Sequence, residues 1–146
     1  MRAVGVRSVA LSDDVFTDHF PGNPVLPGVY LVEGLAQTAG LLLWESSHHA
    51  KIAVMVSIDR ARFTSFARPG DSVRLEVDID SYDERIARIR GVAAVDERQV
   101  AAVALTFTLQ EPEAVIAPLF LPYFAQAADV WLGRYPVGND KTAKHD

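Results

Sequence analysis

The sequence predicts an α+β fold in which one long helix packs against an antiparallel sheet. Residues 29–46 form a mostly apolar run without proline, directly after a loop rich in proline and glycine, which is typical of a helix start. From residue 52 to residue 110, apolar and polar side chains mostly alternate between short polar turns, which is typical of strands. Strands joined by such short turns must be antiparallel, so we expect the helix to cover the resulting sheet.

The overall composition limits the number of domains and the class of partner. A chain of 146 residues with 49% hydrophobic content has the usual size and apolar content of one domain. The formal net charge of -5 argues against general nucleic-acid binding, which requires a clustered basic face. The absence of cysteine excludes disulfides and thiolate nucleophiles and fits a reducing compartment. Without a signal-peptide pattern or an apolar run of ~18 to 20 residues, we expect a cytoplasmic protein with no membrane span.

The N-terminal part of the chain is expected to form one strand and two loops. Residues 4–10 are rich in valine and predict a first strand, whereas residues 12–18 predict a polar loop. Residues 20–28 contain three prolines and two glycines, which favour an ordered, irregular loop over a helix or a central strand. Pro27 can occupy the first turn of the following helix, and Gly28 allows a ligand to approach the free N–H groups there.

The helix predicted over residues 29–46 is expected to be buried on nearly all sides. Glu33 is its only charged side chain before Trp44. An ionised carboxylate that leaves water loses several kcal/mol or takes up a proton, so we expect Glu33 to hold a proton in this apolar setting. Gln37 lies four residues later on the same face, where its amide can hydrogen-bond and orient the carboxyl group. The apolar residues that cover the other sides are Leu31, Val32, Leu35, Leu41, Leu42, Leu43 and Trp44.

The remaining chain is expected to form the sheet and a C-terminal helical extension. Strands are predicted over residues 52–58, 61–66, 72–80, 85–95 and 99–110. A short helix is predicted over residues 122–132, with proline at its start and glycine after its end. We therefore predict one domain over residues 1–111, a helical extension packed on it over residues 112–138, and a disordered tail over residues 139–146.

One pair of side chains suggests proton-transfer chemistry. His19 lies in the rigid loop, and Glu33 lies on the helix that follows it. A base, an acid and backbone N–H groups that hold an oxyanion are the parts required for proton transfer beside a thioester or carbonyl group. Other chemistries lack their motifs, because there is no GxSxG elbow and no nucleotide-binding glycine loop. The adjacent side chains of His48 and His49 cannot converge on one metal ion.

A family signature spans the loop and the first half of the predicted helix. Residues 19–37, HFPGNPVLPGVYLVEGLAQ, resemble the HFPGxPVxPGVLxxEAxAQ pattern of the (3R)-hydroxyacyl-acyl carrier protein dehydratases, which have the hotdog fold. A second segment, SIDRARFTSFARPGDSVRLEVDI, is similar to the family's segment that leads through an ARF sequence into a proline-glycine-aspartate turn. The resemblance covers about residues 2–110, and we expect the family's first strand to be missing. Asp18, Tyr30 and Gly34 stand where the family usually has glycine, leucine and alanine.

The resemblance implies a hotdog fold, with the sheet wrapped around one central helix, and a hydro-lyase reaction. The product would be a trans-2-enoyl thioester of fatty-acid or polyketide-like biosynthesis. The resemblance further implies that His19 is the catalytic base, that Glu33 is the partner acid, and that the Gly28 N–H binds the thioester carbonyl. It implies no metal and no other cofactor, because the thioester already acidifies the α-proton. The other substrate-binding residues in this interpretation are Phe20, Pro27, Val29 and Gln37.

The resemblance also implies a homodimer, or a larger oligomer of dimers. In that dimer His19 of one subunit meets Glu33 of the other, and residues 52–58 pair across the interface. The substrate would be carried on the phosphopantetheine group of an acyl carrier protein or on coenzyme A. The candidate docking residues for an acidic carrier protein are Arg60, Arg62 and Arg68. Two alternatives stay open here, a hotdog acyl thioesterase and a non-catalytic acyl-chain-binding subunit, including one half of a heterodimer.

Overall fold

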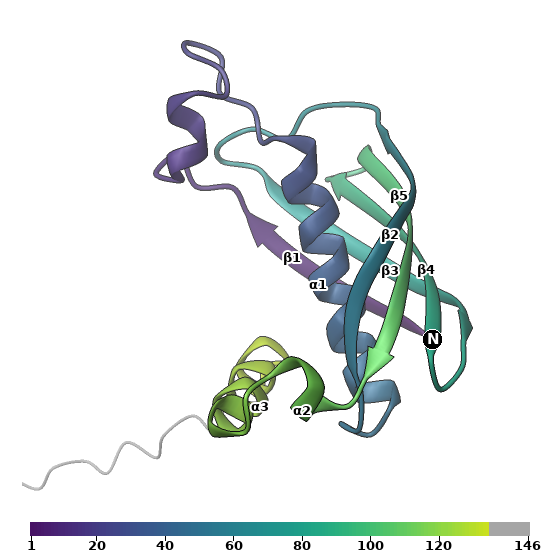
Figure 1. Ribbon diagram of the computed structural model, residues 1–146. Coiled ribbons are helices and arrows are strands. Elements are labelled where there is room, and N and C mark those ends of the chain that lie inside the picture. The colour runs from purple at the N-terminus through teal and green to yellow at the C-terminus, as the bar shows by residue number, and fades with distance from the viewer. Residues whose placement is uncertain (135–146) are drawn as a thin grey trace, which may run out of the picture.

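The computed structural model of the protein describes residues 1–134, and Figure 1 shows the arrangement of its helices and strands. In chain order the elements are β1 (Arg2–Ser8), the 3-10 helix η1 (Asp14–Thr17), α1 (Gly28–Ser46), β2 (Ile52–Phe63), β3 (Ser72–Tyr82), β4 (Ile86–Val95), β5 (Arg98–Gln110), α2 (Pro112–Val115), the 3-10 helix η2 (Pro118–Phe120) and α3 (Leu121–Trp131). The five strands form one antiparallel sheet in the order β1-β3-β4-β5-β2, so β1 and β2 are its edges. The predicted α+β architecture is therefore confirmed.

The three strands predicted over residues 4–10, 52–58 and 61–66 differ from the structure. β1 begins two residues earlier than the predicted strand over residues 4–10, because its pairing with β3 starts at Arg2. The two strands predicted over residues 52–58 and 61–66 are one continuous strand, β2. The register of β2 against β5 shifts after Met55 and again after Ile58. Such irregularities break the two-residue alternation, which is why the sequence pattern suggests an interruption.

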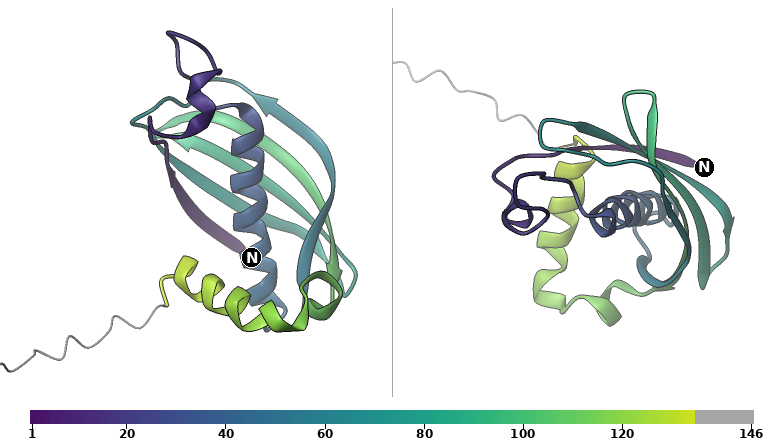
Figure 2. Two further views of the ribbon diagram at one scale, coloured as in Figure 1. Left: turned by 60° about the vertical axis from the view of Figure 1, so that its left-hand side comes forward. Right: turned by 90° about the horizontal axis from the view of Figure 1, so that it is seen from above.

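α1 turns one face to the concave side of the sheet and leaves another face open, as Figure 2 shows. Leu31, Leu35 and Leu43 lie at helical spacing on the inner face and are at most 2% exposed. The prediction that α1 is buried on nearly all sides is wrong for a single chain, because Val29 and Tyr30 are exposed as well as Glu33 and Gln37. The sheet curves around only one side of the helix, so the face that carries Glu33 and Gln37 is not covered by it.

The segments that follow β5 pack against the C-terminal end of α1 (Figure 2). α3 matches the helix predicted over residues 122–132 to within one residue at each end. Phe124 meets Trp44 edge-on, with 5.4 Å between the ring centroids, and Ala128 beside them is only 1% exposed. These residues form an apolar cluster that is separate from the main core.

The predicted division of the chain into residues 1–111, 112–138 and 139–146 stays a prediction. Its last segment lies outside the residues that the structure describes. Within residues 1–134, no helix combines the length and the apolar character that are needed to cross a membrane.

Candidate active site

The loop before α1 is fixed by backbone hydrogen bonds. The Val25 N–H donates to the His19 carbonyl at 2.9 Å, and the Leu26 N–H donates to the Ala67 carbonyl at 2.8 Å. The His19 side chain is half-buried and stacks on the Phe20 ring, with 4.3 Å between the ring centroids. The predicted ordered, irregular loop is confirmed, and it holds the His19 ring in a defined position.

A pocket of about 430 Å³ lies between this loop, the N-terminal end of α1 and the segment that follows β2. The N–H groups of Gly28 and Val29 belong to the first turn of α1 and have no acceptor within the helix. A Cβ atom on Gly28 would lie 2.6 Å from the Phe63 ring, so this close approach requires glycine. Five predicted site residues line the pocket together, namely His19, Phe20, Pro27, Gly28 and Val29.

Glu33 lines a different cavity from His19. The Gln37 side-chain amide donates a hydrogen bond of 3.0 Å to Glu33 Oε1, which confirms the predicted pairing of these two side chains. The two residues lie at one end of a groove of about 330 Å³ between α1, β2 and α3. The expected burial of Glu33 is wrong for a single chain, because its apolar sequence neighbours point to the other faces of α1. The candidate base and the candidate acid of one chain therefore do not share a pocket.

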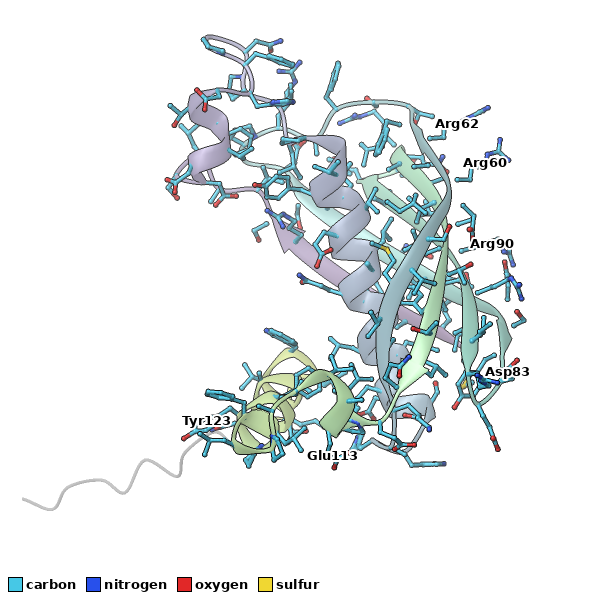
Figure 3. The ribbon with its side chains drawn as sticks, in the orientation of Figure 1. Arg60, Arg62, Asp83, Arg90, Glu113 and Tyr123 are labelled. Carbon is cyan, nitrogen blue, oxygen red and sulfur yellow. The ribbon has the colours of Figure 1, made fainter. Side chains whose placement is uncertain are left out.

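The three candidate docking arginines do not line one pocket. Arg60 and Arg62 lie with Arg90 on the outer face of the sheet, as Figure 3 shows, where they border a groove of about 470 Å³. Arg68 lies elsewhere, since its Nη1 donates a hydrogen bond of 2.6 Å to the Asn23 side chain in the loop that carries His19. The docking role of the three arginines stays a prediction, with Arg68 outside the groove that Arg60 and Arg62 border.

Several residues that line these cavities were not singled out by the sequence. Arg90 joins the outer arginines because it lies opposite Ala104, which in turn lies opposite Arg60. Strand pairing over long sequence separations has no local signal, so this arrangement was not predictable. The other unpredicted lining residues of the His19 pocket are Val25, Leu26, Leu31, Phe63, Thr64, Ser65 and Phe66.

The geometry favours proton-transfer chemistry at a bound carbonyl group. A histidine lies in the same pocket as the N-terminal end of a helix, whose N–H groups and positive dipole end stabilise a developing oxyanion. A carboxyl group, held by an amide, lies on an open face nearby along the same helix. Within residues 1–134, no three histidine or acidic side chains are grouped as a metal site.

Comparison with known proteins finds relatives over most of the chain. Residues 2–104 match the FabA-like domain family. The chain is 40% identical over 111 residues to the 3-hydroxyacyl-[acyl-carrier-protein] dehydratase FabZ of Caldanaerobacter subterraneus subsp. tengcongensis, and the alignment covers 75% of this chain and 79% of that protein. It is 42% identical over 114 residues to the same enzyme of Thermomicrobium roseum, and that alignment covers 77% of this chain and 76% of that protein.

Solved structures resemble this chain in fold. The fluoroacetyl-CoA thioesterase FlK superposes with a TM-score of 0.66 at 13% identity and covers 87% of this chain and 92% of its own. A hot-dog-like protein from Thermanaerovibrio acidaminovorans gives a TM-score of 0.66 at 16% identity, with 86% and 90% covered. The hotdog prediction for the fold is confirmed by these superpositions. At such low identity the likeness concerns the fold alone.

Proposed function

The chain belongs to the FabA-like domain family as a 3-hydroxyacyl-[acyl-carrier-protein] dehydratase of the FabZ type, and from this premise we propose the roles of its residues. The enzyme is a hydro-lyase of fatty-acid synthesis. In the reaction the C2–H and C3–O bonds of the 3-hydroxyacyl thioester break, the C2=C3 double bond forms, and water leaves. The observation that carries the assignments is the pocket in which His19 and Gly28 meet the N-terminal end of α1.

His19 acts as the base that removes the C2 proton. Its ring lines the pocket and stacks on Phe20, which restricts the orientation of the ring. Loss of the proton moves negative charge onto the thioester oxygen. The N–H groups of Gly28 and Val29, together with the positive end of the α1 dipole, stabilise that charge. Phe20, Pro27 and Val29 form walls beside the thioester.

Glu33 acts as the acid that gives a proton to the departing C3 hydroxyl group, and it comes from a second subunit. β2 is an edge strand with exposed apolar side chains, since Val56 is 57% exposed and Ile58 is 50% exposed. Pairing of β2 with its copy covers this edge and continues the sheet across a two-fold axis. In this homodimer the exposed Glu33 of one subunit faces the His19 pocket of the other. The second subunit then supplies the apolar surroundings that a single chain lacks.

The docking of the acyl carrier protein is assigned to two separate basic surfaces. Arg68 contacts the loop that carries His19 and is suited to bind the acidic carrier near the pocket. Arg60 and Arg62 add positive charge on the outer face of the sheet (Figure 3). Complementary charge accelerates the encounter between the two proteins and orients the carrier.

Replacement of His19 by Ala or of Glu33 by Gln tests these roles. Each change should lower kcat by on the order of 10² or more, because it removes one proton-transfer group. The measurement is the formation of enoyl product from a 3-hydroxyacyl group on acyl carrier protein. Matched controls are His48→Asn and Glu113→Gln, which change exposed side chains that line neither cavity and should leave the rate unchanged. Normal turnover by His19→Ala or Glu33→Gln would contradict the assignment.

Product analysis separates dehydration from the two alternatives. Enoyl thioester indicates dehydration, whereas free acid and free carrier thiol indicate a thioesterase. Binding of the acyl carrier without any product indicates a non-catalytic subunit. The superposition on the thioesterase FlK gives no support for hydrolysis, because at 13% identity it concerns the fold alone.

A further inference from the structure

We propose that α3 closes the far end of the acyl-binding groove and thereby limits the length of the acyl chain that the enzyme accepts. This inference rests on the proposed role of Glu33 at the reacting end of the substrate. The groove of about 330 Å³ starts at Glu33 and Gln37 and ends at an aromatic wall. That wall consists of Trp44 from α1 and Phe124 and Trp131 from α3.

The chemistry of the groove matches a 3-hydroxyacyl chain. Its polar end carries the carboxyl and amide groups of Glu33 and Gln37, which suit the C3 hydroxyl group. The rest of its lining is apolar and suits the hydrocarbon tail. The helix rises about 16 Å from Glu33 to Trp44, which is comparable to a medium-length alkyl chain. The apolar lining between the two ends consists of Ala36, Gly40, Leu41, Ile52, Ala53 and Met55.

Gly40 provides a second, independent sign that this groove is a binding space. It lies in the middle of α1, where glycine is less favourable than alanine. A Cβ atom added to Gly40 would meet no atom within 4 Å, so no neighbour in the described chain requires glycine there. Its missing side chain widens the groove halfway between Glu33 and Trp44.

Packing contacts and an ion pair that do not involve Trp131 hold α3 at the end of the groove. Phe124 packs edge-on against Trp44, and Ala128 is buried beside them. Beyond α3, the guanidinium group of Arg134 binds both carboxylate oxygens of Glu45 on α1, at 2.9 and 2.5 Å. Trp131 is 64% exposed and also lines the groove. α3 lies outside residues 2–104, the part of the chain that matches the family model.

The chain-length profile of two variants tests the proposal. Trp131→Ala should raise the ratio of kcat/KM for long over short 3-hydroxyacyl chains by about tenfold or more. Without the indole ring, the additional methylene groups of a long chain can bind in the groove, and each of them favours the long substrate over the short one. Gly40→Leu should lower the same ratio by about tenfold or more, because its side chain fills the middle of the groove. The control is Tyr123→Ala, an exposed aromatic residue of α3 that points away from the groove in Figure 3 and should leave the ratio unchanged.

Binding can be followed without turnover, because the chain contains two tryptophans and both line the groove. A saturated acyl chain on acyl carrier protein lacks the hydroxyl group and serves as the probe. Long chains should change the fluorescence of the wild type, and Gly40→Leu should remove the response to long chains. Size-exclusion chromatography of Gly40→Leu and thermal unfolding of Trp131→Ala report on assembly and on the docking of α3.

Three outcomes are distinguishable. Dehydration with an unchanged chain-length ratio in Trp131→Ala and Gly40→Leu overturns the inference and leaves the proposed function intact. Dissociation of Gly40→Leu into monomers also overturns it, because the groove would then hold a second subunit. Absence of dehydration by the wild type contradicts the proposed function itself.

Discussion

The two ends of α1 differ in how complete they are within one chain. At the N-terminal end, His19 and Gly28 share a pocket, but Glu33 lines a different cavity. At the C-terminal end, α3 covers Trp44 and completes an apolar cluster without any partner. In the mechanism that we propose, dehydration therefore requires a dimer, because His19 and Glu33 come from different subunits. The proposed limit on acyl-chain length requires only α3 of the same chain. On that proposal α3 limits the substrate range without changing the reacting groups, which lie in the loop before α1 and on α1 itself.

Mixing two inactive variants tests whether a second subunit completes the N-terminal end. Homodimers of His19→Ala and of Glu33→Gln each lack both sites, whereas a hybrid dimer retains one intact site. With random exchange, about a quarter of the wild-type activity should return, because half of the dimers are hybrids with one of two sites intact. The activity is measured on co-expressed chains that carry different affinity tags. Purified hybrids without activity would show that the site does not span two subunits.

A methyl group at position 28 tests the close approach at the N-terminal end. Gly28→Ala should reduce kcat about 10- to 100-fold, because the Phe63 ring must move and the first turn of α1 no longer positions the thioester. Steady-state kinetics measure the loss, and circular dichroism checks the fold. The double variant Gly28→Ala, Phe63→Leu should recover part of the activity, because leucine leaves room for the new Cβ atom. An active single variant would show that this contact is not needed.

Acidic pH should weaken the packing of α3 against the C-terminal end of α1. We expect this effect to be smaller than those of the mixed variants and of Gly28→Ala. The Arg134 guanidinium, and then His49, lower the pKa of the Glu45 carboxyl group below its ordinary value of 4.5. Above pH 4.5 the charged Glu45 carboxylate therefore stabilises α3 in its docked position. This contribution to stability is lost as the pH falls through the lowered pKa of Glu45. The effect should be small, because the pair is partly exposed. Tryptophan fluorescence from neutral to acidic pH measures it.

Two variants separate this titration from general acid unfolding. Glu45→Gln should remove this part of the pH dependence, because it has no carboxylate to protonate. Asp83→Asn is the control, since the backbone N–H groups of Arg85 and Ile86 lower the pKa of Asp83 in a hairpin that lies far from α3 (Figure 3). A fluorescence transition that is the same in Glu45→Gln as in the wild type would contradict the predicted role of the ion pair.

Local patterns predicted much of the fold and part of the site. The alternation found between residues 52 and 110 is confirmed in β3, where Val73, Leu75 and Val77 are at most 4% exposed. The prolines and glycines before α1 predicted the loop that holds His19. The continuous strand β2 was missed, because bulges break a pattern whose strand pairing is set by distant residues. The exposure of Glu33 was missed because the sheet's coverage of α1 depends on curvature that no local pattern encodes.

The sequence alone determined which functional groups the site contains, because residue types and short spacings along the chain define them. It placed His19 in a rigid loop, Gly28 at a helix start, and Gln37 one turn after Glu33, where the hydrogen bond is found. Only the tertiary structure decided which of these parts meet in one chain. It separated His19 from Glu33 and brought Trp131 to the groove that starts at Glu33. Such contacts depend on how a curved sheet and a terminal helix enclose α1, which is a property of the whole fold.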